Sequence, residues 1–495
     1  MSKNKIRPTG FTPLAGLPLA ILLLLGSACQ PRPVELTVHT DRPGPMISQD
    51  SLGLSYETLT LLPDEQGRYY FDPNNRELIK LLDTLGIRHI RIGGNSADAP
   101  NIPLPQEQDI RIFFSFARAA GVKVIYTFRL QDGDPEYAAK VASIIRDCHG
   151  GTLQYLAIGN EPSYYKDPSL YASKWAAIRD AVIRQFPDAL FCGPDQNPSP
   201  ELCRRLIRDF STGPGRLALI TQHSYPLGCA YQNPMEALDA NDLSVLIPQD
   251  PVSARQGMLS REVWAVYEKI HGQILEGIKG HDMPYRLTEV NNYWFGGLKG
   301  ASDTYAAALW AIDYIYWWLW HGAVGLNFHT GDRCGGRLIV PCQYAAFIKA
   351  SDGYQVRPLG YGLKVFALGG QGRLIHVDVK GPDRQIVAYA TMTDNGDIFV
   401  TAINTRCDKE TAMTTVQIRL SDGAGIKKAQ AIFLTAPGGD IATQSGLLLG
   451  GAQIRNDGTW DGRWSQVEAL DQESASMTIA MPPASAAVVR ILKDH

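Results

Sequence analysis

Two glutamates follow strand-like segments of this sequence, at positions where they could act as a pair. Glu161 comes after the apolar run LQYLAI at 153–158, with Asn160 beside it, and Glu289 comes after YRLT at 285–288. In barrel folds, residues at the carboxyl ends of the strands face a common space, where catalytic groups lie. A carboxylic acid paired with a carboxylate suits the cleavage of glycosidic bonds. We expect Glu161 to protonate the departing oxygen as the acid/base, and Glu289 to attack the anomeric carbon as the nucleophile.

Other polar residues at the predicted strand ends would complete such a site. Asn160 would hydrogen-bond the sugar 2-hydroxyl, and Tyr225 would donate to Glu289 and keep that carboxylate ionised. Arg91 is expected to pair with Glu161 or Glu289, and its charge would also favour an ionised nucleophile. Four further residues are candidates for contacts with the sugar: Glu57, Asn95, Trp294 and His329.

Several of these residues have a structural alternative. Asn160 would also suit the cap of the following helix, and Trp294 would also suit packing within its own loop. For His223 and His329, hydrogen bonding that lines the end of the barrel is favoured over proton transfer. A purely structural role for the glutamate pair is disfavoured, because each supplies the partner that the other needs.

The segments that must position these residues alternate between short apolar runs and amphipathic helical periods. Eight runs are expected to form strands: 51–56, 87–92, 122–127, 153–158, 189–192, 217–223, 285–288 and 324–328. Helical periods lie between them: 75–85, 107–120, 135–147, 170–185 and 263–279. This alternation predicts an α/β fold, a (β/α)8 TIM barrel with insertions.

Two segments of the barrel region depart from this pattern. Residues 224–261 are rich in Pro, Asn, Asp and Gln, which indicates a long loop that contributes to a binding cleft, with disorder as the alternative. The apolar stretch at 306–324 is interrupted by Asp313. It therefore predicts a helix packed on both sides rather than a membrane span.

The pattern changes after Leu363 to short alternating runs separated by Gly, Asp, Asn and Pro, which predicts an antiparallel β-sandwich. VELTVHT at 34–40 has the same alternation, so an N-terminal strand should join that sandwich. We expect residues 30–48 to supply this strand, 49–355 to form the catalytic barrel and 356–495 to form the sandwich domain.

Residues 1–29 predict an export signal, because basic residues precede an apolar run at 14–25 and small residues follow it. Cys29 directly after Gly-Ser-Ala is similar to a bacterial lipoprotein signal, in which this cysteine would carry the lipid. An ordinary signal peptidase site is the alternative. We expect a protein exported from a bacterial cell to the periplasm, or held at the outer membrane or cell surface as a lipoprotein.

Composition argues against several other classes of function. The 495 residues carry a formal net charge of -3 and are 45% hydrophobic, which suggests neither a nucleic-acid partner nor an anionic membrane surface. The cysteines after Cys29 lack metal-binding CxxC spacing, so buried thiols are favoured, with a loop bridge between Cys334 and Cys342 as a candidate. No metal and no organic cofactor is expected, because two carboxyl groups and water complete the reaction.

Longer motifs around these residues resemble one family of retaining barrel glycosidases. TEVNNYWFGGLKGASDTYAAALWAIDYI, which contains Glu289, is similar to the heparanase and β-glucuronidase family, glycoside hydrolase family 79. GNEP, IRHIRIGGNSAD, VRPLGYGLKVFALGG and MPPASAAVVRI resemble other segments of that family. The resemblance spans about residues 50 to 370 and the last sandwich strand. It implies a TIM barrel with a β-sandwich domain and a β-glucuronide as substrate.

The resemblance also assigns residues to the uronic acid carboxylate. It implies that Gly296 and Gly297 offer backbone N–H groups to this carboxylate and that Tyr344 assists. A Cys-containing insertion at 333–342 precedes Tyr344, and the loop NNYWF is bulkier than is usual in the family.

These observations favour an exported retaining exo-β-glycosidase that acts as a β-glucuronidase on a carbohydrate substrate. One alternative is a retaining β-glycosidase for glucose, galactose or xylose on the same scaffold. The other is a noncatalytic carbohydrate-binding surface lipoprotein. The chain has no dense run of Lys and Arg, which favours exo action on a small or lightly charged substrate. Contact with a membrane is expected only through a lipid at Cys29.

Overall fold

The computed structural model describes residues 32–165, 167–336, 338–381, 385–407, 412–423, 426–467, 469–471 and 476–493. The predicted export signal and Cys29 lie outside these residues. Among the helices that are described, none combines the length and the apolar character that crossing a membrane requires.

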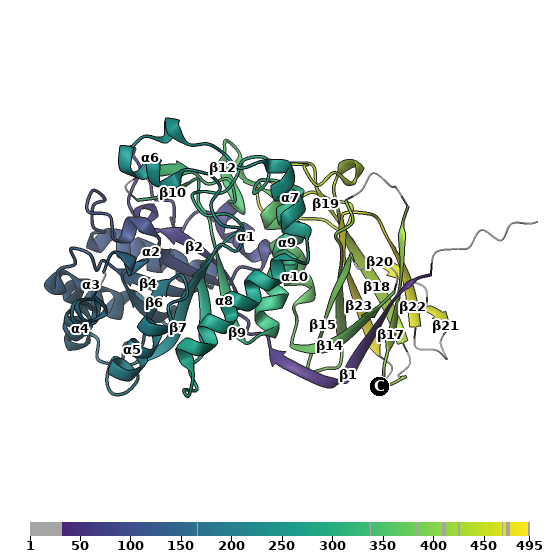
Figure 1. The fold of residues 1–495 in the computed structure, drawn as a ribbon, viewed down its shortest axis with the longest axis horizontal. Coiled ribbons are helices and arrows are strands. Elements are labelled where there is room, and N and C mark those ends of the chain that lie inside the picture. The colour runs from purple at the N-terminus through teal and green to yellow at the C-terminus, as the bar shows by residue number, and fades with distance from the viewer. Residues whose placement is uncertain are drawn as a thin grey trace, which may run out of the picture. The chain divides into compact units, whose positions relative to one another are not determined.

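The expected barrel is present as eight parallel strands that close on themselves (Figure 1). They are β2 (Leu52–Glu57), β3 (His89–Gly93), β4 (Lys123–Phe128), β5 (Leu153–Ile158), β6 (Phe191–Gln196), β7 (Leu217–Ser224), β8 (Tyr285–Val290) and β9 (Ala323–His329). Each strand pairs with the next along the chain, and β2 pairs with β9 to complete the ring. All eight predicted runs correspond to barrel strands, although β6 begins and ends later than the run at 189–192.

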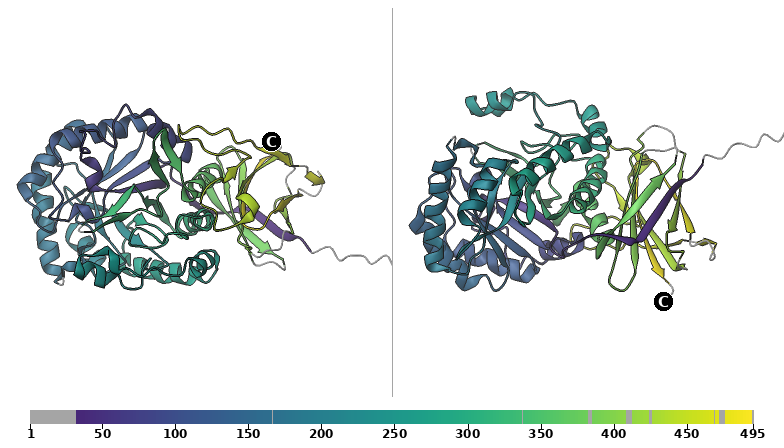
Figure 2. Two further views of the ribbon diagram at one scale, coloured as in Figure 1. Left: turned by 90° about the horizontal axis from the view of Figure 1, so that it is seen from above. Right: turned by 60° about the horizontal axis from the view of Figure 1, so that its bottom comes forward.

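Helices cover the outside of the barrel, as the left view of Figure 2 shows. They are α1 (Arg76–Leu85), α2 (Glu107–Ala120), α3 (Pro135–Cys148), α4 (Pro168–Gln185), α5 (Pro200–Phe210), α8 (Val263–Ile278) and α9 (Tyr305–Trp320). Local chemistry sets their ends. The side chain of Asn75 accepts a hydrogen bond from the N–H of Leu78 at the start of α1, and Gly86 ends that helix with φ 75°. Residues 305–319 of α9 are all buried, which confirms a helix packed on both sides.

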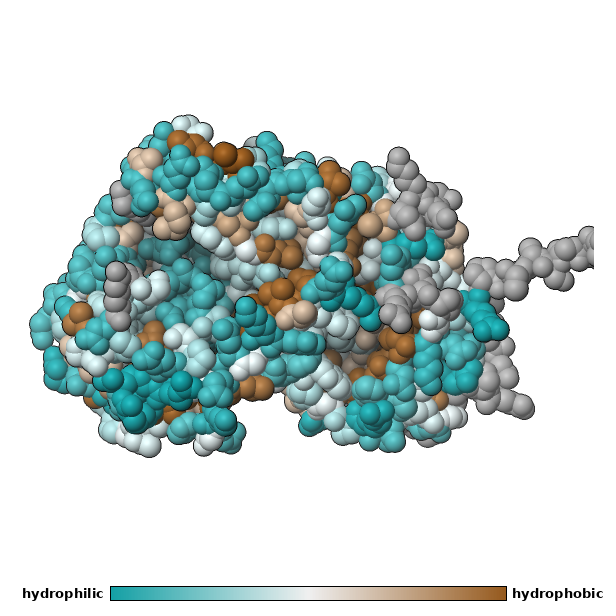
Figure 3. All heavy atoms as spheres, viewed as in Figure 1, coloured by the Kyte–Doolittle hydropathy of each residue, from teal (hydrophilic) through white to brown (hydrophobic). Residues whose placement is uncertain are grey.

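The segment at 224–261 is not the irregular loop that the sequence suggested. It holds α6 (Pro234–Ala240) and α7 (Pro251–Leu259). Each has proline at its first turn, and the Asp250 side chain accepts hydrogen bonds from the first N–H groups of α7, so these residues nucleate helices. Met235 and Ile247 remain exposed, and Figure 3 shows hydrophobic surface at its top, where Figure 1 places α6.

Eleven further strands form one sheet around a second core. They are β1 (Val34–Met46), β14 (Arg373–Lys380), β15 (Ile386–Met392), β16 (Ile398–Asn404), β17 (Thr414–Leu420), β18 (Ile426–Thr435), β19 (Leu448–Leu449), β20 (Ser465–Val467), β21 (Ala469–Asp471), β22 (Ser476–Met481) and β23 (Ser485–Lys493). The predicted N-terminal strand, β1, joins it between β14 and β17. The sheet is mixed rather than antiparallel throughout, because β1 is antiparallel to β14 and parallel to β17. A strand inserted between two antiparallel neighbours must run parallel to one of them.

Close packing and buried hydrogen bonds join the barrel to the sheet. Helix α10 (Pro358–Gly369), which begins just after the segment expected to form the barrel, packs against α9. The hydroxyl of Tyr389 on β15 donates to Asp313 of α9 at 2.7 Å. At Gly362 of α10, a Cβ atom would lie 2.4 Å from the carbonyl oxygen of Ala308, so only glycine fits at this helix crossing.

Replacing Gly362 with valine should therefore lower the free energy of unfolding by about 1–3 kcal/mol, because the two helices must separate. The matched control is Gly272→Ala in α8, where a Cβ atom would have open space. This substitution should leave the free energy of unfolding unchanged or raise it by about 0.5–1 kcal/mol. Thermal and urea denaturation of the two variants measures both effects. Equal stability of Gly362→Val and the parent protein would contradict the close packing of α10 on α9.

Candidate active site

Glu289 lies at the end of β8 with both carboxylate oxygens engaged. The hydroxyl of Tyr225 donates to Oε1 at 2.8 Å, and Nη1 of Arg91 donates to Oε2 at 2.7 Å. Nδ1 of His329 is 3.8 Å from Oε2. These contacts are the ones that the sequence suggested for Tyr225 and Arg91. They orient a carboxylate that is buried but remains at the open end of the barrel.

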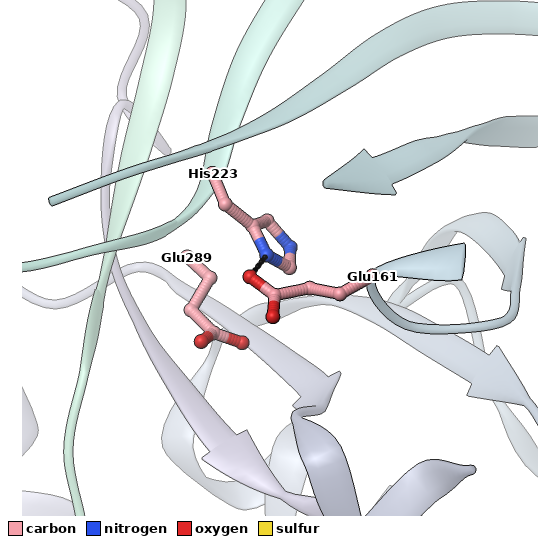
Figure 4. A group of neighbouring side chains, drawn as sticks. All are labelled: Glu161, His223 and Glu289. Atoms are coloured by element: carbon pink, nitrogen blue, oxygen red, sulfur yellow. Dashed lines mark hydrogen bonds and ion pairs between the residues drawn. The ribbon is translucent and has the colours of Figure 1, made fainter. Parts of the chain in front are cut away.

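Glu161 follows β5 and faces Glu289, as Figure 4 shows. Its Oε1 atom is 3.0 Å from Nδ1 of His223, which comes from β7, and its side chain is 30% exposed. The backbone of Glu161 has φ 45°, a left-handed conformation that is unusual for a residue with a side chain. Such strain is characteristic of functional positions, and here it turns the carboxylate into the barrel mouth.

The spacing of the two carboxylates is short. One oxygen of Glu161, one oxygen of Glu289 and one ring nitrogen of His223 all lie within 4.8 Å of one another. A set of two carboxylates and a histidine would also suit a metal ion. However, Arg91 and Tyr225 already donate to the two oxygens of Glu289, and a cation would be placed beside the guanidinium charge. The set is therefore poorly matched to a metal ion.

Arg91 connects the two halves of the site. It is fully buried on β3, and Nη2 donates to Asn160 at 2.7 Å and to Asp195 at 2.6 Å. Asp195 also accepts from the hydroxyl of Thr288 and lies 3.7 Å from Nε2 of His223. Arg91 thus contacts the expected nucleophile, Glu289. Asp195 links Arg91 to His223, which in turn contacts Glu161.

These charges set the ionisation of Glu289. Burial alone would raise the pKa of its carboxyl group. The positive charges of His329, His223 and Arg91, together with the hydrogen bond from Tyr225, instead lower the pKa to about 2. Glu289 is therefore an anion at neutral pH, as a nucleophile must be.

The same group of charges raises the pKa of His223. Burial alone would lower the pKa of its imidazole, but the carboxylates of Glu289, Asp195 and Glu161 raise it to about 9. The pKa of Asp195 is held below its usual range, because Arg91 and His223 outweigh its desolvation. At neutral pH His223 is thus a buried imidazolium that lies between Asp195 and Glu161.

A cavity of about 770 Å³ opens above these residues. Its wall includes the glutamate pair and most of the residues that the sequence singled out: Glu57, Asn95, Asn160, Glu161, Tyr225, Glu289, Trp294, Gly296, His329 and Tyr344. Neutral polar side chains add to it, among them Asn101, Gln131, Ser163 and Asn197. No Lys or Arg belongs to this wall among the residues for which the structure gives positions.

Two predicted sugar contacts have other partners in the protein. Glu57 is 1% exposed, and its carboxylate accepts from the N–H and hydroxyl of Ser96 and from the N–H of Gly335. Asn160 is held between Arg91 and the side chain of Asn95, with its Nδ2 3.1 Å from Asn95 Oδ1. Both residues thus help to build the wall, and Asn160 keeps its amide at the cavity surface.

The residues assigned to the uronic acid carboxylate are only partly brought together. Gly296 and Tyr344 line the cavity, whereas Gly297 lies behind them, where a Cβ atom would contact Tyr344 and Ser302. Both glycines have positive φ, 76° and 87°, which explains the residue type. Within the part of the chain that the structure describes, neither glycine N–H donates a hydrogen bond.

Sequence reasoning missed Asp195. The strand predicted at 189–192 ends before this residue, so Asp195 does not fall at a predicted strand end. Extending that strand to Gln196 would have placed Asp195 at the same rim as Glu161. His223 was expected to form hydrogen bonds at the end of the barrel, and the structure adds that its partner is Glu161.

Similarity to known proteins is distant in sequence and extensive in fold. No protein-family model matches the sequence. The chain is 24% identical over 386 residues to a β-glucuronidase of Aspergillus niger, and the match covers 64% of this chain and 67% of that protein.

Solved structures share the fold over almost the whole chain. A GH51 arabinofuranosidase from Xanthomonas axonopodis pv. citri superposes with a TM-score of 0.64 at 14% identity, covering 93% of this chain and 100% of that one. A 4-O-α-L-rhamnosyl-β-D-glucuronidase from Fusarium oxysporum, solved with Rha-GlcA, has a TM-score of 0.65 at 19% identity and covers 92% and 99%. By fold and by sequence similarity, the chain is glycoside hydrolase-like.

Proposed function

We propose that this glycosidase is an exported retaining exo-β-glucuronidase of glycoside hydrolase family 79. The observation that carries the proposal is the short separation of Glu161 and Glu289, with oxygens within 4.8 Å. Retaining enzymes hold their two carboxyl groups about 5–5.5 Å apart, whereas inverting enzymes leave about 6.5–9.5 Å for a water molecule. The similarity to a β-glucuronidase supports the choice of sugar.

In the first step, Glu289 attacks the anomeric carbon and Glu161 gives its proton to the departing oxygen. The bond from carbon to the aglycone breaks as the bond to Glu289 forms, and a glycosyl-enzyme remains. The ion pair with Arg91 and the hydrogen bond from Tyr225 keep Glu289 ionised and aimed at the carbon. Asn160 lies beside Arg91 at the cavity surface, where its amide can reach the 2-hydroxyl.

In the second step, Glu161 removes a proton from water, and the resulting oxygen nucleophile attacks the same carbon and releases Glu289. Two inversions restore the β configuration. His223 holds Glu161 at 3.0 Å through both steps, and its charge offsets the surrounding carboxylates.

For the uronic acid carboxylate, the free N–H of Gly296 and the Tyr344 hydroxyl are the proposed contacts. Backbone N–H groups and hydroxyls can hold an anion without a basic side chain. This suits a cavity wall whose described residues include no Lys or Arg, and a substrate that is small and lightly charged.

A β-glycosidase for a neutral sugar is the second candidate. Glu57 and Asp98 both belong to the cavity wall, and their negative charges near the catalytic pair favour a neutral sugar over a second anion. A noncatalytic binding protein is disfavoured, because binding alone requires neither the ionised Glu289 nor the strained Glu161. Export to the periplasm or cell surface, with a lipid at Cys29, is proposed from the signal-like sequence at 1–29.

The paired roles can be tested with Glu161→Gln and Glu289→Gln on nitrophenyl and alkyl β-glucuronides. Glu289→Gln should abolish turnover of both substrates, because no nucleophile remains. Glu161→Gln should lower kcat by about 100-fold to 10,000-fold on the alkyl glycoside, which needs protonation, and much less on the nitrophenyl glycoside. Glu276→Gln, an exposed glutamate of α8, is the control. Release of the α-anomer by the parent protein, seen by proton NMR, would contradict retention.

Uronate recognition can be tested with Tyr344→Phe. Loss of a hydroxyl that binds a carboxylate should lower kcat/KM for the glucuronide by about 10-fold to 100-fold. The same change should leave kcat/KM for the glucoside nearly unaltered. Tyr231→Phe, a half-buried tyrosine outside the cavity wall, is the matched control. A parent protein that prefers glucoside, galactoside or xyloside would favour the neutral-sugar candidate.

The charges of the site predict a pH dependence of stability. The pKa of His223 is raised from 6.5 to about 9, so its contribution is complete below pH 6.5 and is lost as pH rises through 9. The pKa of Glu289 is lowered from 4.5 to about 2, so its contribution is complete above pH 4.5 and is lost as pH falls towards 2. The two contributions coexist fully only between about pH 4.5 and 6.5.

Urea unfolding of the parent protein and His223→Asn at pH 6 and pH 9.5 tests the alkaline limb. Between these pH values, the free energy of unfolding of the parent should fall by on the order of 3 kcal/mol more than that of the variant. The exposed residue His281 provides the control variant His281→Asn, which should follow the parent. An equal change in the free energy of unfolding for the parent and His223→Asn would show that His223 is not positively charged in the folded protein at pH 6.

A further inference from the structure

A small hairpin forms one wall of the cavity. It consists of β10 (Arg333–Gly335) and β11 (Ile339–Pro341), which pair antiparallel, and a disulfide links Cys334 within β10 to Cys342 just after β11. The bridge that the sequence suggested is therefore present. Cys334, Gly335, Gly336, Leu338 and Val340 all line the cavity. Two three-residue strands are too short to be stable alone, so the disulfide and outside contacts must hold them in place.

The hairpin is attached to three other loops of the barrel mouth. The N–H of Gly335 donates to Glu57 Oε1 at 2.7 Å, after β2. Gly336 approaches the loop after β3 so closely that a Cβ atom would lie 2.7 Å from the carbonyl oxygen of Asn95. Val340 packs on Gly296 of the loop after β8. The hairpin thus spans the rim from β8 across β9 and β2 to β3.

The position of this wall relative to the two glutamates follows from the order of the barrel strands. The hairpin follows β9, and β9 is the fourth strand from β5 in either direction around the eight-stranded ring. Glu161, which follows β5, protonates the leaving group, so the aglycone must lie on the β5 side of the mouth. The hairpin therefore encloses the opposite side, where the sugar that is transferred to Glu289 must lie.

We propose that the disulfide-linked hairpin closes the sugar end of the cavity and makes the enzyme specific for a terminal, unsubstituted sugar. The inference rests on the proposed function and names the element that imposes exo action. Glu57 is a positioning residue in this scheme, because its buried carboxylate anchors Gly335. Leu338 and Val340 present apolar surface where a further sugar unit, or a substituent on the terminal sugar, would have to pass.

The test compares the parent protein with the double variant Cys334→Ser/Cys342→Ser. Substrates are a nitrophenyl β-glucuronide and its 4-O-methyl derivative; should a neutral sugar be preferred, the corresponding pair is used. The parent should cleave the unsubstituted compound and discriminate against the methylated one by at least about 100-fold in kcat/KM. The double variant should show a KM raised about 10-fold, kcat within about 3-fold, and a clearly smaller discrimination.

Two controls separate the disulfide from other effects. Dithiothreitol supplies two electrons and two protons, which convert the disulfide to two thiols while the reagent becomes a cyclic disulfide. The parent treated in this way should behave like the double variant, and the double variant should not respond. Cys148→Ser, a half-buried free cysteine far along the chain from the hairpin, should match the parent in all assays.

A second variant acts on the same wall without touching the cysteines. Gly336→Val should push the hairpin away from the Asn95 carbonyl and reduce the discrimination in the same direction. Hydrogen exchange followed by mass spectrometry should show faster exchange at 95–101 and 333–336 in both variants. Equal cleavage of the two substrates by the parent would overturn the inference, as would unchanged discrimination and exchange in both variants.

Failure of the proposed function would look different. If the parent cleaves none of the nitrophenyl glycosides, the function is wrong, and the hairpin is then judged by exchange and by calorimetric binding of free glucuronate and glucose. Faster exchange with weaker binding in the double variant would still support a closing wall. Unchanged exchange and binding would overturn it independently of turnover.

Discussion

The buried guanidinium of Arg91 is the interaction on which the rest of the site depends. Moving a charge out of water is costly unless charged and hydrogen-bonding partners surround it. Here those partners are Glu289 at 2.7 Å, Asp195 at 2.6 Å and Asn160 at 2.7 Å. They come from three different barrel strands or the turns after them, so one side chain fixes the relative positions of β5, β6 and β8. The positive charge of Arg91 in turn helps to keep Glu289 ionised.

Glu161 is tied to the same network through its backbone. The N–H of Glu161 donates to the carbonyl oxygen of Asp195 at 2.9 Å, and both residues adopt left-handed backbone conformations, with φ 45° and 57°. Strain of this kind persists only where surrounding contacts over-determine the structure. His223 completes the link, because its ring lies between Glu161 and Asp195. Glu161 and Glu289 are therefore positioned by one connected set of charges.

The walls of the cavity come from loops that are stabilised in different ways. The loop after β7 is ordered by α6 and α7, and the loop after β9 is ordered by a disulfide and by the carboxylate of Glu57. The eleven-stranded sheet lies outside the cavity wall, and it stabilises the barrel through α10 and the pair of Tyr389 with Asp313. The chemistry is thus placed on strand ends and the specificity on loops, a division common in barrel enzymes.

The sequence alone was sufficient for the barrel and for the joining of β1 to the sheet, because these depend on local periodicity. Glu161 and Glu289 were chosen because they directly follow apolar runs; the structure places them face to face, and their catalytic roles stay a prediction. Tyr225 was expected to donate to Glu289 and does so, and Arg91, expected beside Glu161 or Glu289, contacts Glu289, since opposite charges and donors at one rim have few other partners. Asp195, the contact of His223 with Glu161 and the use of Glu57 as an anchor needed the tertiary structure. Those contacts join residues from 28 to 278 positions apart, and their partners are set by strand order and by backbone geometry that no local pattern records.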